Sequence, residues 1–379
     1  MTITKNAKSL IAALLCAGLL TGCANTTSGS SDSSDNSVSK PVSDNSDSAP
    51  ENSQTPADTE QAEPTSEASA PDNGEAAPIP APESVRIAAL SGPTAMGMTK
   101  LMEDDETEDL LYDFTIAAAP DELSPMIIQG NVDICCVPAN LGAVLSQKTE
   151  GGVQVLAVNT LGVLYLCENG NTVAEISDLR GKTIYSAGKG STPEYALNYI
   201  LSENGINPET DVNIEWKSEH AECVAALTAD EDGVAMLPQP FATVAQSQNE
   251  GINVVVDLND EWDKLDNGSS LITGAVIVRT EFAEQYPEVV NQFLSDYKAS
   301  VDYVNNNVSD AAQLVEKFGI IKAAVAEKAI PKCHIVCITG AEMKDKLSGY
   351  LNVLFEQNPQ SVGGAVPADS FYYSYEFPG

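Results

Sequence analysis

Short apolar segments alternate with helix-like segments over most of the chain, and this alternation restricts the fold more than any other feature. Runs of Val, Ile and Ala separated by helices are typical of parallel sheets that are covered on both faces. The pattern therefore predicts the α/β class. Strands are expected at 85–90, 112–118, 132–137, 153–158, 162–167, 182–187, 212–216, 234–237, 252–256 and 274–278, with helices at 96–102, 122–129, 141–147, 194–204, 221–228 and 241–248.

The C-terminal part has a different pattern. Consecutive helices are expected at 280–306, 309–318, 323–329 and 339–355. Two series of α/β units followed by a helical tail predict two lobes, each a mainly parallel sheet flanked by helices, with the tail packed on the first lobe. The predicted crossings near Ser177 and Asn267 divide the chain into a first lobe of 85–177 and 268–379 and a second lobe of 178–267.

The segment from Gly181 to Gly205 reads as a strand, a glycine-bearing turn and a helix. Ser191 or Thr192 is suited to cap this helix, and Pro193 fits its first turn. The start of such a helix presents unpaired N–H groups and a partial positive charge, which suit a small polar or anionic ligand. In the alternative interpretation, Glu194 and the capping hydroxyl form a capping box and satisfy these donors themselves.

Ligands of open α/β sheets bind beyond the carboxyl ends of the strands. The predicted turns at these ends are rich in small polar residues, glycine and proline, which ordinary strand-to-helix turns also use. The two best candidates, the turns 91–94 and 188–192, are predicted in different lobes, so a cleft between the lobes would bring both turns to one ligand. The candidate ligand-binding residues are Ser91, Gly92, Pro93, Thr94, Pro138, Ala139, Asn140, Asn159, Thr160, Gly188, Lys189, Gly190, Ser191, Thr192, Pro238, Gln239 and Phe241.

The N-terminus has the pattern of an export signal. Lys5 and Lys8 precede an apolar run from Leu10 to Leu20, which is too short to span a membrane comfortably. The following Thr21-Gly22-Cys23 resembles the lipobox of bacterial lipoproteins. This resemblance implies that residues 1–22 are a signal peptide and that Cys23 carries diacylglycerol and palmitate; the alternative is an ordinary signal peptide with a chance cysteine. We expect a protein anchored by its N-terminal lipid on the extracytoplasmic face of the cell membrane.

The segment from Cys23 to Ser84 is rich in Ser, Pro, Asp and Glu and almost lacks large apolar residues, so we expect a disordered acidic tether. Lys40 is its only basic residue. The formal net charge of the whole chain is −36, which argues against nucleic acid and anionic lipid as partners. The charge does not restrict what a cleft binds, because distant charges are largely screened.

Six cysteines follow the tether, and we interpret them as mostly buried small hydrophobic residues. They are Cys135, Cys136, Cys167, Cys223, Cys333 and Cys337. An even number in an exported protein also suits a disulfide framework, so their redox state stays open. His220 and His334 are the only histidines, too few to favour a zinc site. No metal and no cofactor are expected.

Four segments carry a family resemblance: DELSPMIIQGNVDICCVP, ISDLRGKTIYSAGKGSTPEYAL, TGAVIVRTEFAEQYPEVVNQFL and NPQSVGGAVPADSFYY. From about Val85 to the C-terminus the chain resembles the substrate-binding lipoproteins of ABC importers, in particular the nitrate, sulfonate, taurine and thiamine-pyrimidine binders. The resemblance implies a type II periplasmic-binding-protein fold whose two lobes close on a solute. It also implies delivery of the solute to a separate permease driven by a separate ATPase.

The resemblance adds Thr273 and Gly274, at the second crossing, to the ligand-binding candidates. Tyr165, Tyr185 and Phe241 are aromatic residues that either line the cleft or belong to the core. Lys189 and few other bases lie near these turns, so both an anionic ligand and a neutral heterocycle stay open. Residues 361–364 either rim the cleft or form a flexible turn.

Two other functions stay open. An enzyme of the same fold would need a nucleophile, a base and an orienting group, and the sequence indicates no such set. A binding lipoprotein that reports to a sensor or partner protein would have the same sequence features as an importer subunit. We expect a monomer.

Overall fold

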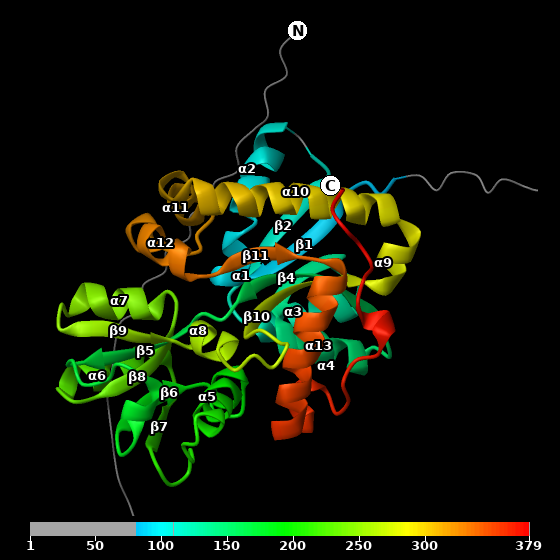
Figure 1. The fold of residues 1–379 in the computed structure, drawn as a ribbon. Helices are drawn as coiled ribbons and strands as arrows, with labels where there is room; N and C mark the ends of the chain where they lie inside the picture. The colour runs from blue at the N-terminus through cyan, green and yellow to red at the C-terminus, as the bar shows by residue number, and fades with distance from the viewer. Residues whose placement is uncertain (1–80, 109, 379) are drawn as a thin grey trace, which may run out of the picture. The chain divides into compact units, whose positions relative to one another are not determined.

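The described part of the chain, residues 81–108 and 110–378 of the computed structural model, is built on two β-sheets (Figure 1). The predicted signal peptide, the predicted lipidation site Cys23 and nearly all of the predicted tether lie outside the described residues. None of the described helices combines the length and the apolar character that a membrane crossing requires.

The first sheet has six strands in the order β11-β4-β10-β3-β1-β2. These strands are β1 (Val85–Leu90), β2 (Tyr112–Ala117), β3 (Ile134–Pro138), β4 (Val153–Leu161), β10 (Ile272–Arg279) and β11 (Ile335–Ile338). The second sheet has five strands in the order β7-β6-β8-β5-β9. Its strands are β5 (Leu164–Asn169), β6 (Thr183–Ala187), β7 (Asn213–Lys217), β8 (Val234–Pro238) and β9 (Ile252–Asp257).

The predicted α/β class, with two sheets flanked by helices, is confirmed, and in each sheet most strands point the same way while one or two run opposite. Strand β1 pairs in parallel with β2 and β3, and β6 pairs in parallel with β7 and β8. The strands next to the crossings run the other way: β10 is antiparallel to β3 and β4, and β5 is antiparallel to β8 and β9. Strand β11, which the sequence did not predict, is antiparallel to β4.

The direction of β5 follows from where the chain changes sheets. Strand β4 ends at Leu161 and β5 begins at Leu164, so the chain passes from the first sheet to the second at residues 162–163. Strand β5 begins at the side of the second sheet where the chain enters it. Since β8 ends at that side, β5 has to run in the opposite direction to β8. The predicted crossing near Ser177 assigned β5 to the first lobe, and the sheet topology contradicts this. The chain returns between α8 (Leu258–Asp263) and β10, a stretch that includes Asn267.

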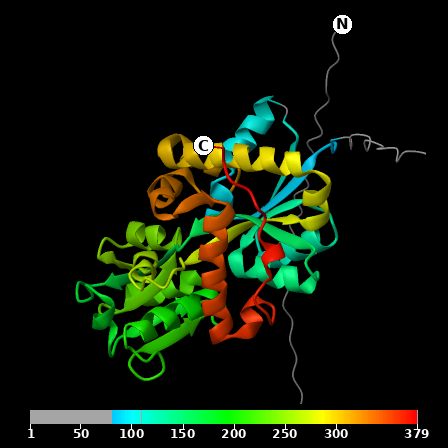
Figure 2. The ribbon, with the colours of Figure 1, turned by 45° about the vertical axis from the view of Figure 1, so that its right-hand side comes forward.

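Helices cover both sheets (Figures 1 and 2). The helices that follow strands β1 to β3 are α1 (Pro93–Met96), α2 (Thr99–Glu108), α3 (Pro120–Ile128) and α4 (Ala139–Lys148). The helices of the second lobe are α5 (Thr192–Glu203), α6 (His220–Ala229), α7 (Phe241–Gln248) and α8. The tail contains α9 (Thr280–Gln285), α10 (Pro287–Asn306), α11 (Val308–Lys317), α12 (Ala323–Ala329) and α13 (Gly340–Gln357), and the short 3₁₀ turns are 176–179, 330–332, 359–362 and 369–371.

The helix predicted over 280–306 is two helices in the structure. Pro287 restricts the residue before it, and Tyr286 leaves the helical region with φ −131° and ψ 55°. Pro287 then occupies the first turn of α10, where its missing N–H costs nothing. The break therefore follows from one proline.

The tail packs on the first lobe but also reaches the second. Helix α10 packs against α2 and α11, whereas α13 packs against both β4 and α5. Beyond the core contacts, Gln357 Nε2 donates to the backbone oxygen of Tyr195 at 3.0 Å, and Asn358 Nδ2 donates to the hydroxyl oxygen of Tyr195 at 2.8 Å. The end of the tail thus connects the two lobes.

Candidate functional site

A cavity of about 400 Å³ lies between the lobes, at the carboxyl ends of β3 and β8 and beside the first crossing. Such a position is where ligands of open α/β sheets bind. Both lobes and the crossing contribute to its lining, which consists of Pro120, Pro138, Asn140, Leu141, Val163, Leu164, Ser191, Thr192, Pro193, His220, Pro238 and Thr273. Six of these residues, namely Pro138, Asn140, Ser191, Thr192, Pro238 and Thr273, were predicted as ligand-binding candidates.

Side chains from the two lobes meet at this cavity. Thr192 Oγ1, at the start of α5, donates to Asn140 Oδ1, near the start of α4, over 3.5 Å. Asn140 Nδ2 donates to the backbone oxygen of Ser361 at 3.2 Å. Ser361 is buried in a 3₁₀ turn, so the segment 361–364 begins in packed structure beside Asn140.

The start of α5 keeps its N–H groups free of side-chain caps. Ser191 is the N-cap residue, but its hydroxyl donates to the Gly188 backbone oxygen at 2.6 Å and makes no capping bond. Glu194 accepts from the Gly190 N–H at 2.5 Å, outside the helix. The predicted capping box therefore does not form, and the start of this twelve-residue helix lies beside the cavity at Ser191 and Thr192, with Glu194 as an acidic residue in its first turn.

His220 belongs to the cavity lining and was missed as a ligand-binding candidate. It is the first residue of α6, and its ring lies 5.1 Å from the ring of Phe241 between centroids. Burial lowers the pKa of His220, so its imidazole is neutral at pH 7, and its Nδ1 atom is buried without a hydrogen-bond partner among the described residues. Its position just after a predicted strand was a usable signal, since the other candidates were chosen on that ground.

Four first-lobe candidates form a buried polar cluster beside β10, and none of them lines the cavity. Asn159 Nδ2 donates to the Thr94 backbone oxygen at 3.1 Å, and Thr160 Oγ1 donates to Asn159 Oδ1 at 3.1 Å. A Cβ atom on Gly274 would lie 2.5 Å from Thr94 Cγ2, so only glycine fits there. Ser91, Gly92 and Pro93 form the turn that leads into this cluster, and Gly92 has a φ of 117°.

The other candidates lie around the cavity lining without belonging to it. Ala139 is buried at the start of α4, Gln239 accepts from Thr243, and Phe241 lies beside His220. Gly188 and Gly190 shape the turn before α5, with φ values of 87° and 77°. Lys189 lines a separate surface pocket with Glu194 and Trp216. Among the twelve lining residues, all of them described, there is no Lys or Arg.

Tyr165 and Tyr185 bond elsewhere. The Tyr165 hydroxyl donates to the Lys332 backbone oxygen at 2.7 Å, and the Tyr185 hydroxyl donates to Asp230 at 3.0 Å. Neither residue lines the cavity, so the alternative in which these rings stack on a ligand finds no support in the geometry.

The first crossing is closely packed. The Gly162 N–H donates to Asn259 Oδ1 at 3.1 Å, and the Gly162 oxygen lies 2.5 Å from His334 Nδ1. A Cβ atom on Gly162 would approach Leu271 Cδ2 to 2.7 Å. His334 Nε2 also lies 3.6 Å from Oδ2 of Asp257, the last residue of β9. The crossing therefore has little space for a larger residue.

All six cysteines of the described part are free thiols, and five of them are buried. The interpretation as buried small residues is confirmed for these five, while Cys337 is partly exposed. In residues 81–108 and 110–378, no group of three or more His, Cys, Asp or Glu side chains is placed to hold a metal ion. A larger groove of about 510 Å³ lies in the first lobe, between α2 and α10 and away from the cleft.

Three comparisons relate this chain to known proteins. The sequence profile of the family described as ABC transporter, phosphonate, periplasmic substrate-binding protein matches residues 106–329. No curated protein matches the chain. Many solved structures have the same fold, and three of them illustrate the likeness.

An ABC transporter protein from Parabacteroides distasonis has a TM-score of 0.66 and 22% identity, over 78% of this chain and 100% of that chain. The periplasmic aliphatic sulphonate-binding protein of Escherichia coli has a TM-score of 0.61 and 15% identity, over 77% and 96%. The alkanesulfonate-binding protein of Xanthomonas axonopodis pv. citri, bound to MOPS, has a TM-score of 0.54 and 13% identity, over 76% and 95%.

At these identities the structures establish the fold, which is the type II periplasmic-binding-protein fold that the resemblance implied. The family profile matches more than half of the chain and therefore establishes the family as well as the fold. The chain belongs to the family of periplasmic substrate-binding proteins of ABC transporters whose profile is named for phosphonate.

Proposed function

We propose that the protein is the extracytoplasmic solute-binding lipoprotein of an ABC importer and that its solute occupies the cavity between the lobes. The observation that carries this proposal is that residues of both lobes line one cavity, with Asn140 and Thr192 in contact across it. A solute that contacts both lobes favours their closed arrangement, because it gains contacts only when the lobes are together.

The lining suits a small molecule with an apolar body and one polar or singly charged group. Its walls are mostly apolar, formed by Pro120, Pro138, Leu141, Val163, Leu164, Pro193 and Pro238. The polar groups are an amide, three hydroxyls and the neutral imidazole of His220, beside the start of α5. A helix start stabilises one negative charge, but this lining supplies no cation for a second.

We therefore place sulfonates and pyrimidine-type heterocycles before phosphonate dianions as ligands. Nitrate has no apolar body to use the walls, and the ammonium group of taurine would meet the helix start or the apolar residues. In this proposal the solute leaves the cavity chemically unchanged and passes to a permease driven by an ATPase.

The lipid anchor is part of the same proposal. The Leu20-Thr21-Gly22-Cys23 segment supports it, and Cys23 is the proposed site of lipidation. Metabolic labelling with a palmitate analogue, followed by gel detection, tests this point; the Cys23→Ser variant is expected to lose the label, and label that persists in the variant would refute the assignment.

Thermal melting tests the solute class. Butanesulfonate and hydroxymethylpyrimidine are expected to raise the melting temperature, whereas nitrate, taurine and butylphosphonate are expected to have little effect. A ligand at about 100 times its dissociation constant stabilises by about 2.7 kcal/mol, a shift that calorimetry resolves easily. A shift with butylphosphonate alone would refute the charge argument but keep the cavity, whereas conversion of any compound would indicate an enzyme.

A further inference from the structure

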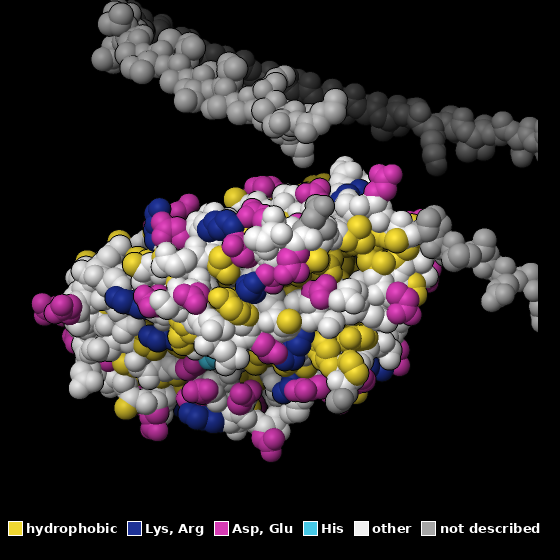
Figure 3. Space-filling model, turned by 90° about the horizontal axis from the view of Figure 1, so that it is seen from above, with side chains coloured by type: hydrophobic (Ala, Val, Ile, Leu, Met, Phe, Trp, Pro, Cys, Tyr) yellow, Lys and Arg dark blue, Asp and Glu magenta, His cyan; other side chains and the backbone are white. Residues whose placement is uncertain are grey.

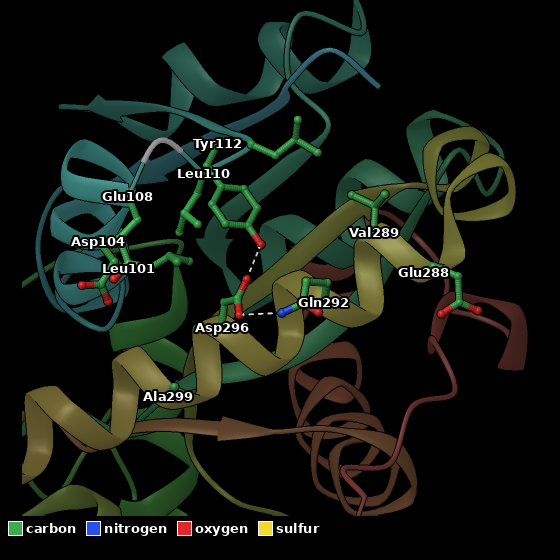
Figure 4. Close-up of a pocket in the computed structure, with 11 residues that line it drawn as sticks. Leu101, Asp104, Glu108, Leu110, Tyr112, Glu288, Val289, Gln292, Asp296 and Ala299 are labelled. Carbon is green, nitrogen blue, oxygen red and sulfur yellow. Dashed lines mark hydrogen bonds between the residues drawn. The ribbon is translucent and has the colours of Figure 1, made fainter. Parts of the chain in front are cut away.

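The groove in the first lobe lies between the end of α2, the start of β2 and the first half of α10 (Figure 4). Its volume is about 510 Å³, compared with about 400 Å³ for the cavity between the lobes. The strand ends beside it are opposite to those at the cleft: Leu111 precedes β2 and Tyr112 begins it, whereas Pro138, which lines the cleft, ends the parallel strand β3. A partner in this groove and a solute in the cleft would therefore not compete for space.

Apolar side chains in this groove are exposed to solvent. Leu110 and Leu111 are 37% and 36% exposed, and the only other large hydrophobic residue that is exposed in the described part is Ile128. Val289, which is partly exposed, extends the apolar surface from α10, while Leu101 lies buried beneath it in α2. These neighbouring side chains form a small apolar surface that a partner would remove from water.

The apolar surface is bordered by carboxylates. Asp104 and Glu108 lie on α2, and Glu288 and Asp296 lie on α10, while no Lys or Arg is among the eleven lining residues, all of which are described. Figure 3, viewed from above Figure 1, shows acidic side chains beside exposed hydrophobic ones on this side of the molecule. Lys100 forms an ion pair with Asp104 and offsets one of the four charges.

Asp296 is held in place by neutral donors. The Tyr112 hydroxyl donates to Asp296 Oδ2 at 2.7 Å, and Gln292 Nε2 donates to Asp296 Oδ1 at 2.8 Å (Figure 4). Burial, together with Asp296, raises the pKa of Tyr112, so the phenol stays protonated and keeps donating. These bonds fix the position of the carboxylate without neutralising it, which leaves a negative charge for a partner to meet.

Charge excludes several occupants. The preceding segment 24–84 has Lys40 as its single base among many acids, and the whole chain has a formal net charge of −36. The acidic border would therefore repel that segment, whose charged residues are almost all acidic, as it would an anionic lipid surface. A segment that carries apolar and basic side chains would satisfy both the leucines and the carboxylates.

We propose that this groove docks an amphipathic segment of a partner protein, with leucine-like side chains packed on Leu110 and Leu111 and with lysine or arginine side chains facing Glu108, Glu288 and Asp296. Helix-in-groove recognition of this kind uses apolar anchors at helical spacing, and the acidic border adds attraction and orientation.

A labelled peptide tests the proposal on the full-length chain. The peptide has about 18 residues, with Leu on one helical face and Lys beside it. We expect it to bind, as measured by fluorescence anisotropy, with an affinity that falls as the salt concentration rises. The L110S/L111S variant is expected to lose about tenfold in affinity, because it removes the apolar anchors. Glu288→Gln is expected to lose about threefold and to show a weaker salt dependence.

Two matched substitutions are the controls. Ile128→Ser changes the third exposed hydrophobic residue, and Glu284→Gln changes an exposed glutamate on the neighbouring α9; both lie outside the groove and should leave the affinity unchanged. Equal affinity in all four variants would overturn the proposal, since the peptide would then bind to acidic charge elsewhere in the chain. A photo-crosslinking group on the peptide should label residues 101–112 or 288–299, and labelling confined to other segments would also overturn it.

Two further outcomes distinguish other occupants. If L110S/L111S converts a dimer to a monomer in sedimentation, the groove is a contact between copies. If spermine displaces the peptide and binds L110S/L111S as tightly as the unchanged chain, the groove is a site for small cations. Either result would overturn the proposal.

Discussion

Thr192 Oγ1 lies 3.5 Å from Asn140 Oδ1, and this contact joins the first turns of two helices that belong to different lobes. At this distance the hydrogen bond is long, so it contributes little to stability. Both side chains also line the cavity, which makes them available to a solute placed between the lobes.

The Thr192→Val variant is expected to lower the affinity for a solute such as butanesulfonate about fivefold, because one hydrogen bond contributes about 1 kcal/mol. The melting temperature without solute should stay nearly the same. Calorimetric titration measures the affinity, and Lys189→Gln is the control because Lys189 lies outside the cavity lining. A larger loss in the Lys189 variant would show that the solute binds elsewhere.

Asp133 is expected to be a major source of stability in the first lobe. The side chain is 3% exposed and accepts bonds from Arg86 at 2.6 Å and from Arg279 at 2.9 Å. Asp133→Asn leaves Arg86 without its carboxylate partner and Arg279 with only the exposed Glu281, so we expect a loss of about 3 kcal/mol at pH 7. Urea unfolding measures this loss, and the exposed Asp232→Asn should change the stability far less.

The contacts of Asp133 with Arg86 and Arg279 also predict how the stability of the protein depends on pH. Burial opposes ionisation of Asp133, but hydrogen bonds from Arg86 and Arg279 outweigh it and lower its pKa. The folded protein therefore binds this proton less readily than the unfolded chain does. The stabilisation is present above the ordinary carboxyl pKa of about 4 and is lost as the pH falls through the lowered folded value. The stability difference between Asp133→Asn and the unchanged chain should shrink below about pH 4, and a constant difference down to about pH 2 would contradict the assignment.

Gly274→Ala is expected to destabilise the first lobe by about 2 kcal/mol, because overpacking a closely packed site costs this much. The added Cβ would meet Thr94 and Asn159, both buried, whereas in Gly251→Ala it would meet only the ends of two asparagine side chains at 3.2 Å. Thermal melting of the two variants compares them. Similar melting temperatures would mean that the buried cluster around Thr94 can move aside.

The six thiols of the described part are expected to react slowly in the folded protein. Burial raises the pKa of Cys135, Cys167, Cys333 and Cys337 to about 12, so little thiolate exists at pH 8. Alkylation followed by peptide mapping should find Cys337 modified first, since it is partly exposed. Reductant should not change the melting temperature; a disulfide between any two of these residues would contradict the prediction.

The sequence was informative wherever one element determines its own form. Most strands and helices were predicted to within a few residues, because each carries its own apolar period and turn residues. The break before Pro287 was missed although the proline itself signals it. Helix α8 was missed because it is short and acidic, and its N-cap bond from the Asn259 N–H to Asp257 is not specific to helices in sequence.

The assignment of strands to sheets was less accessible. Strand β5 has the same apolar character as the strands before it, so nothing in its residues indicates that it pairs with β8 and β9.

The candidate site was also predicted only in part, because its geometry depends on contacts between distant segments. Thr94 and Ser191 follow strands in equivalent ways, yet Ser191 lines the cavity and Thr94 bonds inward to Leu90. Which turn faces the cavity depends on how the lobes pack, and that is a long-range property.

The two hydrogen bonds that the side-chain amides of Gln357 and Asn358 donate to Tyr195 restrict how far the lobes can separate. Together with the two crossings they make three connections between the lobes. Separation of the lobes at the end of α13 requires both hydrogen bonds to break. Gln357 and Asn358 do not line the cavity, yet they add to the free energy needed to open the proposed solute site.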